Sequence, residues 1–307
     1  MLVIGEVHTG LLRGHHQATA SLVDLVAGEP VRSFDRPRAH VRSPDRPVGV
    51  DCPLGAPTPA RRVRGIGTVL QRAAITGGHV VQGTAWATVV PAGGGTRQPW
   101  PYYLARPGVI EAVGRARPSE LAAALAATEH APEALDLGAI AGRASDLVQA
   151  AVPPGDRSRE RLRLPRTRLR FVVERGETTG PPVLTVHGDR SRILRAALPA
   201  GTEPRLLAAF AEDLALHDWL LTSVIGIVDR AAIGALPRDE SLRRLRPAVD
   251  HLLHLWLPAG RGGELARQLW ETLDRHAALS RQWSLLRDRI RDQFIVGAVA
   301  ALSAMPR

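Results

Sequence analysis

An adjacent histidine and aspartate in a long apolar segment are the first residues of this sequence that could support chemistry. His217 and Asp218 follow Asp213 by about one helical turn in the stretch EDLALHDWLL. Histidine and carboxylate ligands on one helix can bind a divalent metal and activate water, so these residues form a candidate metal site of a hydrolase. The alternative is an i, i+4 pair between Asp213 and His217 in a helical core. We favour the core pair, because the nearest upstream histidine, His187, falls on a predicted strand.

Asp250, His251 and His254 form a second group at helical spacing. Three such side chains on neighbouring positions could also bind a metal, but no HExxH general base accompanies them. Chance spacing on an amphipathic helix explains them better. We therefore expect no metal site, no catalytic residues and no cofactor.

The segment RQPWPYYLAR holds both tyrosines of the chain beside a tryptophan and between two arginines. Aromatic faces next to guanidinium groups can stack on bases or grip an extended peptide. The alternative is a loop that buries the tryptophan as an anchor. The candidate partner-binding residues are Arg97, Trp100, Tyr102, Tyr103 and Arg106.

Arginine is concentrated in one segment, Asp156 to Arg170, which carries seven arginines against two acidic residues. Such a segment could neutralise several phosphates of a nucleic acid. Its last part alternates arginine with Thr167, Leu169 and Phe171, as a half-buried strand requires, and we favour a strand there. The candidate basic patch consists of Arg161, Arg163, Arg166, Arg168 and Arg170.

The element that must position many of these residues is a helix predicted over residues 202–234. Thr202 can cap its start, Pro204 suits its first turn, and Gly234 marks its end. Its side chains are apolar around most of the circumference, so other elements must cover it on most sides. We therefore predict the central helix of a bundle.

Extended segments dominate the first part of the chain. Residues 62–75 and 79–90 are two extended runs separated by Thr76-Gly77-Gly78, which is typical of a tight hairpin. Helices are expected at 119–129 and 136–151. Beyond the basic segment, residues 166–174, 183–187 and 193–198 predict a small β meander.

The last part of the chain repeats apolar residues at steps of three and four, from Leu265 to Ala301. This spacing predicts one continuous helical seam, which could contact a protein partner or form part of the core. The predicted fold class is α+β, with an N-terminal β-rich part with hairpins and a C-terminal helical bundle around the long central helix. The predicted domains are residues 1–155, β-rich with a helical pair at the end, and residues 156–307, a small meander followed by the bundle.

Composition limits the function classes. The 307 residues carry a net charge of +10, but the 40 basic residues are all arginine. Exclusive use of arginine reflects a G+C-biased genome and is weak evidence for phosphate binding. No lysine exists to complete a phosphate-binding P-loop, and the single cysteine, Cys52, rules out an internal disulfide framework. We expect a cytoplasmic protein with no membrane span.

Seven segments spread over the chain form a distinctive set: GEVHTGLL (5–12), GVDC (49–52), VRGIGTVLQRAAITGGHVVQGTA (63–85), PWPYYLARPGVIEAVG (99–114), LDLGAIA (135–141), TRLRF (167–171) and EDLALHDWLL (212–221). With these segments the chain resembles an uncharacterised actinobacterial protein family of about this length. The resemblance implies a component of a multi-protein system, encoded beside a variant P-loop protein and a methyltransferase-like protein, and it carries no known activity.

The sequence therefore favours a non-enzymatic interaction or adaptor component of a cytoplasmic multi-protein system. The expected partner is a protein, with the co-encoded P-loop protein as the first candidate. One alternative is a nucleic-acid-binding protein that uses residues 157–170. A second alternative is a metal-dependent hydrolase centred on His217 and Asp218.

Overall fold

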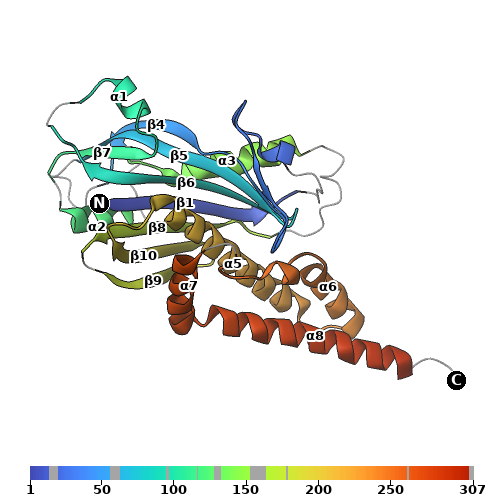
Figure 1. Cartoon of the computed structure of the whole chain (residues 1–307). Coiled ribbons are helices and arrows are strands. Elements are labelled where there is room, and N and C mark those ends of the chain that lie inside the picture. Colours follow the sequence, from blue (N-terminus) through green and yellow to red (C-terminus); the bar gives the residue numbers. More distant parts are fainter. Residues whose placement is uncertain are drawn as a thin grey trace.

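The first strand, β1 (Leu2–Leu11), sends alternate side chains into two different cores, and this alternation sets the layers of the molecule. Leu2 and Ile4 pack beneath α2 (Pro118–Leu125) and α3 (Leu137–Ala151), whereas Val3 and Val7 pack beneath α5 (Pro204–Ala231). One mixed sheet therefore has helices on both faces (Figure 1). This computed structural model describes residues 1–13, 20–55, 63–94, 97–115, 117–127, 133–152, 164–177, 179–260 and 263–303.

The predicted α+β class is confirmed, and the strands belong to a single ten-stranded sheet. Its order is β2-β3-β5-β7-β6-β1-β8-β10-β9, with β4 also paired to β5. Because β1 pairs with both β6 and β8, the sheet is continuous across the expected boundary at residue 155. The remaining strands are β2 (Arg32–Phe34), β3 (His40–Arg42), β4 (Arg46–Pro53), β5 (Arg64–Thr76), β6 (Val80–Pro91), β7 (Val109–Val113), β8 (Thr167–Gly176), β9 (Gly180–His187) and β10 (Ser191–Pro199).

The predicted hairpin is present between β5 and β6. Gly77 and Gly78 form its turn with φ of 61° and 69°, values that glycine adopts without strain. The long β5 pairs with β3 and β4 along one edge and with β6 and β7 along the other. The hairpin is thus the centre of the N-terminal part of the sheet.

The three strands after the basic segment do not form the predicted meander. β10 lies between the other two, parallel to β8 and antiparallel to β9. The physical reason is in β9, which contains Pro181 and Pro182. Proline has no N–H to donate to a neighbouring strand, so β9 occupies the edge of the sheet instead of the middle.

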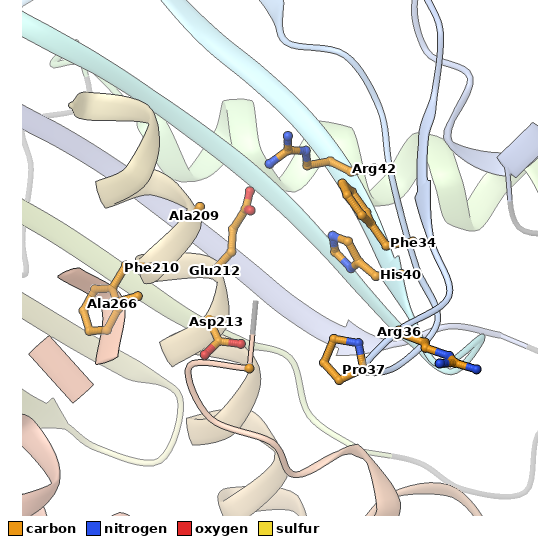
Figure 2. A pocket seen from close by; sticks show the side chains of 11 residues that line it. Phe34, Arg36, Pro37, His40, Arg42, Ala209, Phe210, Glu212, Asp213 and Ala266 are labelled. Carbon is orange, nitrogen blue, oxygen red and sulfur yellow. The ribbon is translucent and has the colours of Figure 1, made fainter. Parts of the chain in front are cut away.

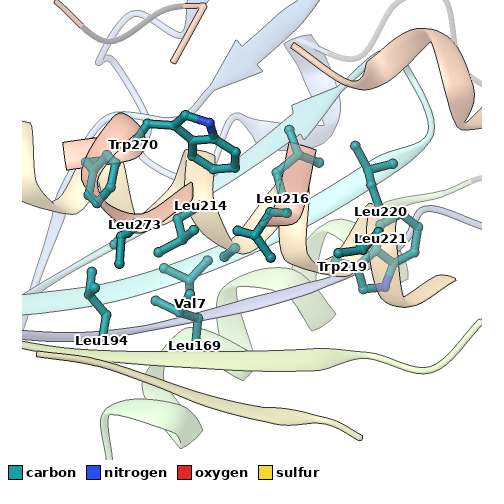
Figure 3. Close-up of a cluster of buried hydrophobic side chains, with 14 of the residues drawn as sticks. Val7, Leu169, Leu194, Leu214, Leu216, Trp219, Leu220, Leu221, Trp270 and Leu273 are labelled. Carbon is teal, nitrogen blue, oxygen red and sulfur yellow. The ribbon is translucent and has the colours of Figure 1, made fainter. Parts of the chain in front are cut away.

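The central helix is confirmed as α5 (Pro204–Ala231), and every residue from 210 to 221 is buried. It lies between the sheet and the other C-terminal helices, and Figure 3 shows Leu214 of this helix over Val7, with Leu169 and Leu194 on the adjacent strands. The helix ends before Gly234, because Ala232 adopts a left-handed conformation with φ of 45°. The other helices are η1 (Ala20–Val23), α1 (Trp100–Leu104), α2 (Pro118–Leu125), α3 (Leu137–Ala151), α6 (Arg238–His251), η2 (Leu253–Leu255), α7 (Glu264–Ala277) and α8 (Leu279–Ser303).

The predicted continuous seam from Leu265 to Ala301 is wrong in one respect. Ala278 adopts φ of 51° and breaks it into α7 and α8. The inward residues Leu269, Leu273, Trp283 and Ile290 are buried in the core around α5. These residues of the seam are therefore intramolecular core, and α7 and α8 each expose another face to solvent. Within the described ranges, no helix combines the length and the apolarity that crossing a membrane requires.

Candidate functional site

His217 lies in the core of the helical layer. Its Nδ1–H donates to the carbonyl of Asp213 at 2.6 Å, and its Nε2 accepts from the backbone N–H of Leu257 at 3.1 Å. These partners fix a neutral ring with the proton on Nδ1. The ring packs edge-on against Trp256 and Trp270, with centroids 5.0 and 5.2 Å away. Both nitrogens are already used, so His217 has no lone pair for a metal.

The two aspartates of the predicted metal group point to different partners. Asp213 Oδ1 accepts from Arg38 Nη2 at 2.9 Å, and its Oδ2 accepts from the N–H of Ala259 at 2.7 Å. Asp218 accepts from Arg192 Nε at 2.9 Å, and burial raises its pKa despite that arginine. In the part of the chain that the structure describes, no three His, Cys, Asp or Glu side chains are grouped as metal ligands. The favoured interpretation of a core pair agrees with this geometry.

The second histidine group meets a third histidine. The ring of His79, in the β5–β6 turn, lies 4.9 Å from His251 and 6.3 Å from His254, measured between centroids. Asp250 instead pairs with Arg246 on the surface at 3.2 Å. Burial and the nearby His251 lower the pKa of His254. The histidines therefore form a packing contact between the hairpin and α6.

A buried ionic layer between the sheet and α5 escaped the sequence analysis. Arg72 on β5 donates through Nε to Glu212 Oε1 at 2.6 Å, and Thr84 donates to the same oxygen at 2.7 Å. Burial alone would raise the pKa of Glu212, but the charge and hydrogen bond of Arg72 outweigh it and lower that pKa to about 2. One signal was available, because Arg72 is the only charged residue between Gly65 and Thr76 of this buried strand.

The predicted basic patch is divided. Arg161 and Arg163 lie outside the described residues. Arg166, Arg168 and Arg170 alternate with buried residues at the start of β8, which supports the strand interpretation. Two of these arginines are paired, Arg166 with Asp146 at 2.6 Å and Arg170 with Glu6 at 2.9 Å.

A groove of about 610 Å³ runs beside this patch, along α3. His8, Arg143 and Arg168 line it, together with the paired Arg166, and Asp136 and Asp146 supply negative charge. Beneath it, Glu6 is buried between His8 and Arg170. Burial opposes ionisation of Glu6, yet the hydrogen bond from His8 and the charge of Arg170 lower its pKa to about 2. The mixed charges of the groove make it a weak phosphate site.

The aromatic segment forms the short helix α1, which stands above β4 and β7 (Figure 1). Trp100, Tyr102 and Leu104 are 38%, 41% and 57% exposed, whereas Tyr103 is only 2% exposed and anchors the helix. The anchor in the expected loop is therefore Tyr103 and not Trp100. We call the exposed set, with Arg97 and Arg106, the α1 surface.

The arginines of the α1 surface are held by neighbouring acids. Arg97 lies 5.6 Å above the Trp100 ring and pairs with Asp51 at 3.0 Å. Arg106 lies 5.1 Å above the Tyr102 ring and pairs with Glu111 at 2.5 Å. Tyr102 also donates to Glu111 at 2.7 Å, which raises the pKa of Tyr102. The result is a rigid aromatic surface with nearly balanced charge.

Comparisons with protein-family models, with curated proteins and with solved structures give no match to this chain.

Proposed function

We propose that this protein is an interaction or adaptor component of a multi-protein system, and that it binds a protein partner through the α1 surface. One observation carries this proposal. Three large side chains, those of Trp100, Tyr102 and Leu104, are exposed together on a five-residue helix. Tryptophan, tyrosine and arginine dominate the energetics of protein interfaces, and a fixed backbone reduces the entropy lost on binding.

The charges around α1 favour a protein over a nucleic acid. A phosphate backbone is bound by guanidinium groups that can give up their counterions. Arg97 and Arg106 instead neutralise Asp51 and Glu111, and Arg64 also pairs with Asp51. The surface thus offers aromatic area with little net charge, which suits the centre of a protein interface.

A second exposed apolar surface supports an adaptor role. Ile295, Val299 and Leu302 follow one another at helical spacing on α8 and are all exposed. This end of α8 projects from the body, at the opposite end of the molecule from α1 (Figure 1). Two separated apolar surfaces are what a protein needs to hold two partners at once.

The proposal is tested by affinity capture from the native host with the tagged full-length chain. The test variant is Trp100→Ala/Leu104→Ala, and the matched control is Val183→Ala/Val186→Ala, which truncates two exposed side chains on the edge strand β9. We expect the test variant to lose a stoichiometric protein partner, with the co-encoded P-loop protein as the first candidate, and the control to retain it. Unchanged capture by the test variant would refute the proposed role of the α1 surface.

Repeating the affinity capture after nuclease digestion distinguishes an adaptor protein from a nucleic-acid-binding protein. Protein partners that survive nuclease digestion support the adaptor. Partners lost on digestion, together with binding that weakens steeply with salt, would instead favour the groove beside Arg166 and Arg168. Replacing these two arginines by glutamine would then reduce the salt dependence.

A further inference from the structure

A cavity of about 310 Å³ lies between the β2–β3 segment and α5, away from both proposed protein-binding surfaces. Phe34, His40 and Arg42 form one wall, and Phe210, Glu212 and Asp213 of α5 form the other (Figure 2). An apolar lining with a few polar groups directed inward is typical of sites for small organic molecules, and the volume is in their range.

Arg42 is the group in this cavity that most needs an anion. Within the described residues its guanidinium forms no hydrogen bond and no ion pair, although the residue is partly buried. It also lies directly opposite Arg32 in the β2–β3 pairing, so two like charges share one face of the sheet. Burial and the neighbouring Arg72 lower the pKa of Arg42, and the charges of Glu212 and Asp45 offset this only in part. A bound anion would relieve this repulsion and use the fork of guanidinium donors.

The two carboxylates of α5 do not prevent this binding, because each already has an arginine partner. Arg72 contacts Glu212 at 2.6 Å, and Arg38 contacts Asp213 at 2.9 Å. The lining itself carries Arg36 and Arg42 against Glu212 and Asp213. The side chains paired with these acids and with one another behind the lining are those of Arg38, Arg72, Arg205 and Asp45. Together these five arginines and three acids have an excess of two positive charges. The cavity therefore has a net attraction for anions.

The other side chains that line the cavity determine which chemical group can carry the anion. The ring of Phe34 is 45% exposed at the mouth and lies 6.2 Å from the ring of His40. These rings provide a stacking surface for a flat ligand. Arg72 and Thr84 both donate to Oε1 of Glu212, so its Oε2 can accept a hydrogen bond from an N–H group on that ligand.

We propose that this cavity binds a small organic anion in which a phosphate or a carboxylate is attached to a planar ring. Arg42 contacts the anionic group, Phe34 stacks on the ring, and Glu212 accepts from a ring substituent. The site is independent of the α1 surface, so either proposal can fail without the other.

Isothermal titration calorimetry on the full-length chain tests the site. The probes are adenosine monophosphate and 4-aminobenzoate, which combine a ring with an anion, and adenosine and inorganic phosphate, which each lack one part. We expect one of the two ring-bearing anions to bind, and to bind about tenfold or more tightly than adenosine or phosphate. Which of the two binds better distinguishes a phosphate ligand from a carboxylate ligand.

Three variants complete the test, with folding checked by circular dichroism. Arg42→Gln and Phe34→Ala should each weaken binding by about tenfold. Phe34 lies on an edge strand and is half exposed, so its truncation leaves the fold intact even if Arg42→Gln does not. Arg195→Gln, an exposed arginine on β10, should bind as the unmodified protein does. No binding of any probe at millimolar concentration, or equal binding by Phe34→Ala, would overturn the proposal.

Discussion

The guanidinium of Arg38 and the carboxylate of Asp213 meet at 2.9 Å, although the two residues are 175 positions apart in the sequence. Arg38 comes from the β2–β3 segment and is 8% exposed. The same guanidinium also donates to the carbonyl of Leu255 and approaches Nε2 of His217. One side chain thus ties the edge of the sheet to the central helix and to the turn beyond α6.

This pair should make a large contribution to stability. Because removal of one partner leaves the other charge buried without compensation, Arg38→Met and Asp213→Asn should each cost about 3–5 kcal/mol of unfolding free energy. The double variant should cost less than the sum of the two, as measured by urea denaturation. Additive costs would show that the residues act independently. Arg246→Gln, which breaks an exposed pair with Asp250, should cost less than about 1 kcal/mol.

Acid should destabilise the protein through Glu6. The pKa of Glu6 is about 2 in the folded protein, whereas the ordinary value of a glutamate, which applies to the unfolded chain, is 4.5. As the pH falls, Glu6 is therefore protonated at a higher pH in the unfolded chain than in the folded protein. The stabilisation is complete above pH 4.5 and disappears as the pH approaches 2. The melting temperature of Glu6→Gln should therefore fall less steeply between pH 4.5 and pH 2 than that of the unmodified protein. Glu271→Gln, on the exposed face of α7, is the control and should retain the steep loss.

A milder acid effect should come from the histidine contact between the hairpin and α6. Because the pKa of His254 is lowered in the folded protein, His254 of the unfolded chain takes up a proton near pH 6.5, before His254 of the folded protein does. The free energy of unfolding therefore decreases as the pH falls through that value. His254→Gln should remove this part of the pH dependence. Thermal melts at intervals between neutral and mildly acidic pH measure it, and an unchanged slope in the variant would contradict the assignment.

Gly83 on β6 should not tolerate a side chain. A Cβ there would lie 2.1 Å from the carbonyl oxygen of Ala141 and 2.8 Å from the N–H nitrogen of Ser145, so α3 would have to move away from the sheet. We expect Gly83→Ala to cost about 1–3 kcal/mol in urea denaturation. Gly93→Ala meets nothing within 4 Å and should change stability by less than about 1 kcal/mol. Equal effects of the two substitutions would show that α3 does not depend on close contact at Gly83.

Features set by local chemistry were predictable from the sequence. Gly77 and Gly78 define the hairpin turn, and Asp136 caps α3 by accepting from the N–H of Ala139 at 2.8 Å. Features set by distant contacts were not. In the order β8-β10-β9, the prolines of β9 keep this strand out of the middle position. This effect of proline predicts a strand order only when it is already known that the three strands belong to one sheet.

The candidate sites also depend on contacts between residues that are distant in the sequence or on packing that residue type does not determine. The exposure of Trp100 and Tyr102 depends on the anchor Tyr103, and residue type alone could not decide which aromatic ring would be buried. The cavity beside Arg42 is formed by segments about 170 residues apart, so no local pattern could indicate it. Arg72, the only charged residue between Gly65 and Thr76, was the one sequence signal for a buried ionic layer.

The place of β1 between β6 and β8 has a consequence for biosynthesis. A nascent chain can pair β1 with β6 once β6 has been made as far as Pro91, but the other edge of β1 stays open until β8 is complete at Gly176. During that interval an almost fully buried strand exposes its N–H and C=O groups to other chains. Of the ten strands, β1 is made first and is therefore among the last to be fully paired, and truncated chains that end before β8 should aggregate.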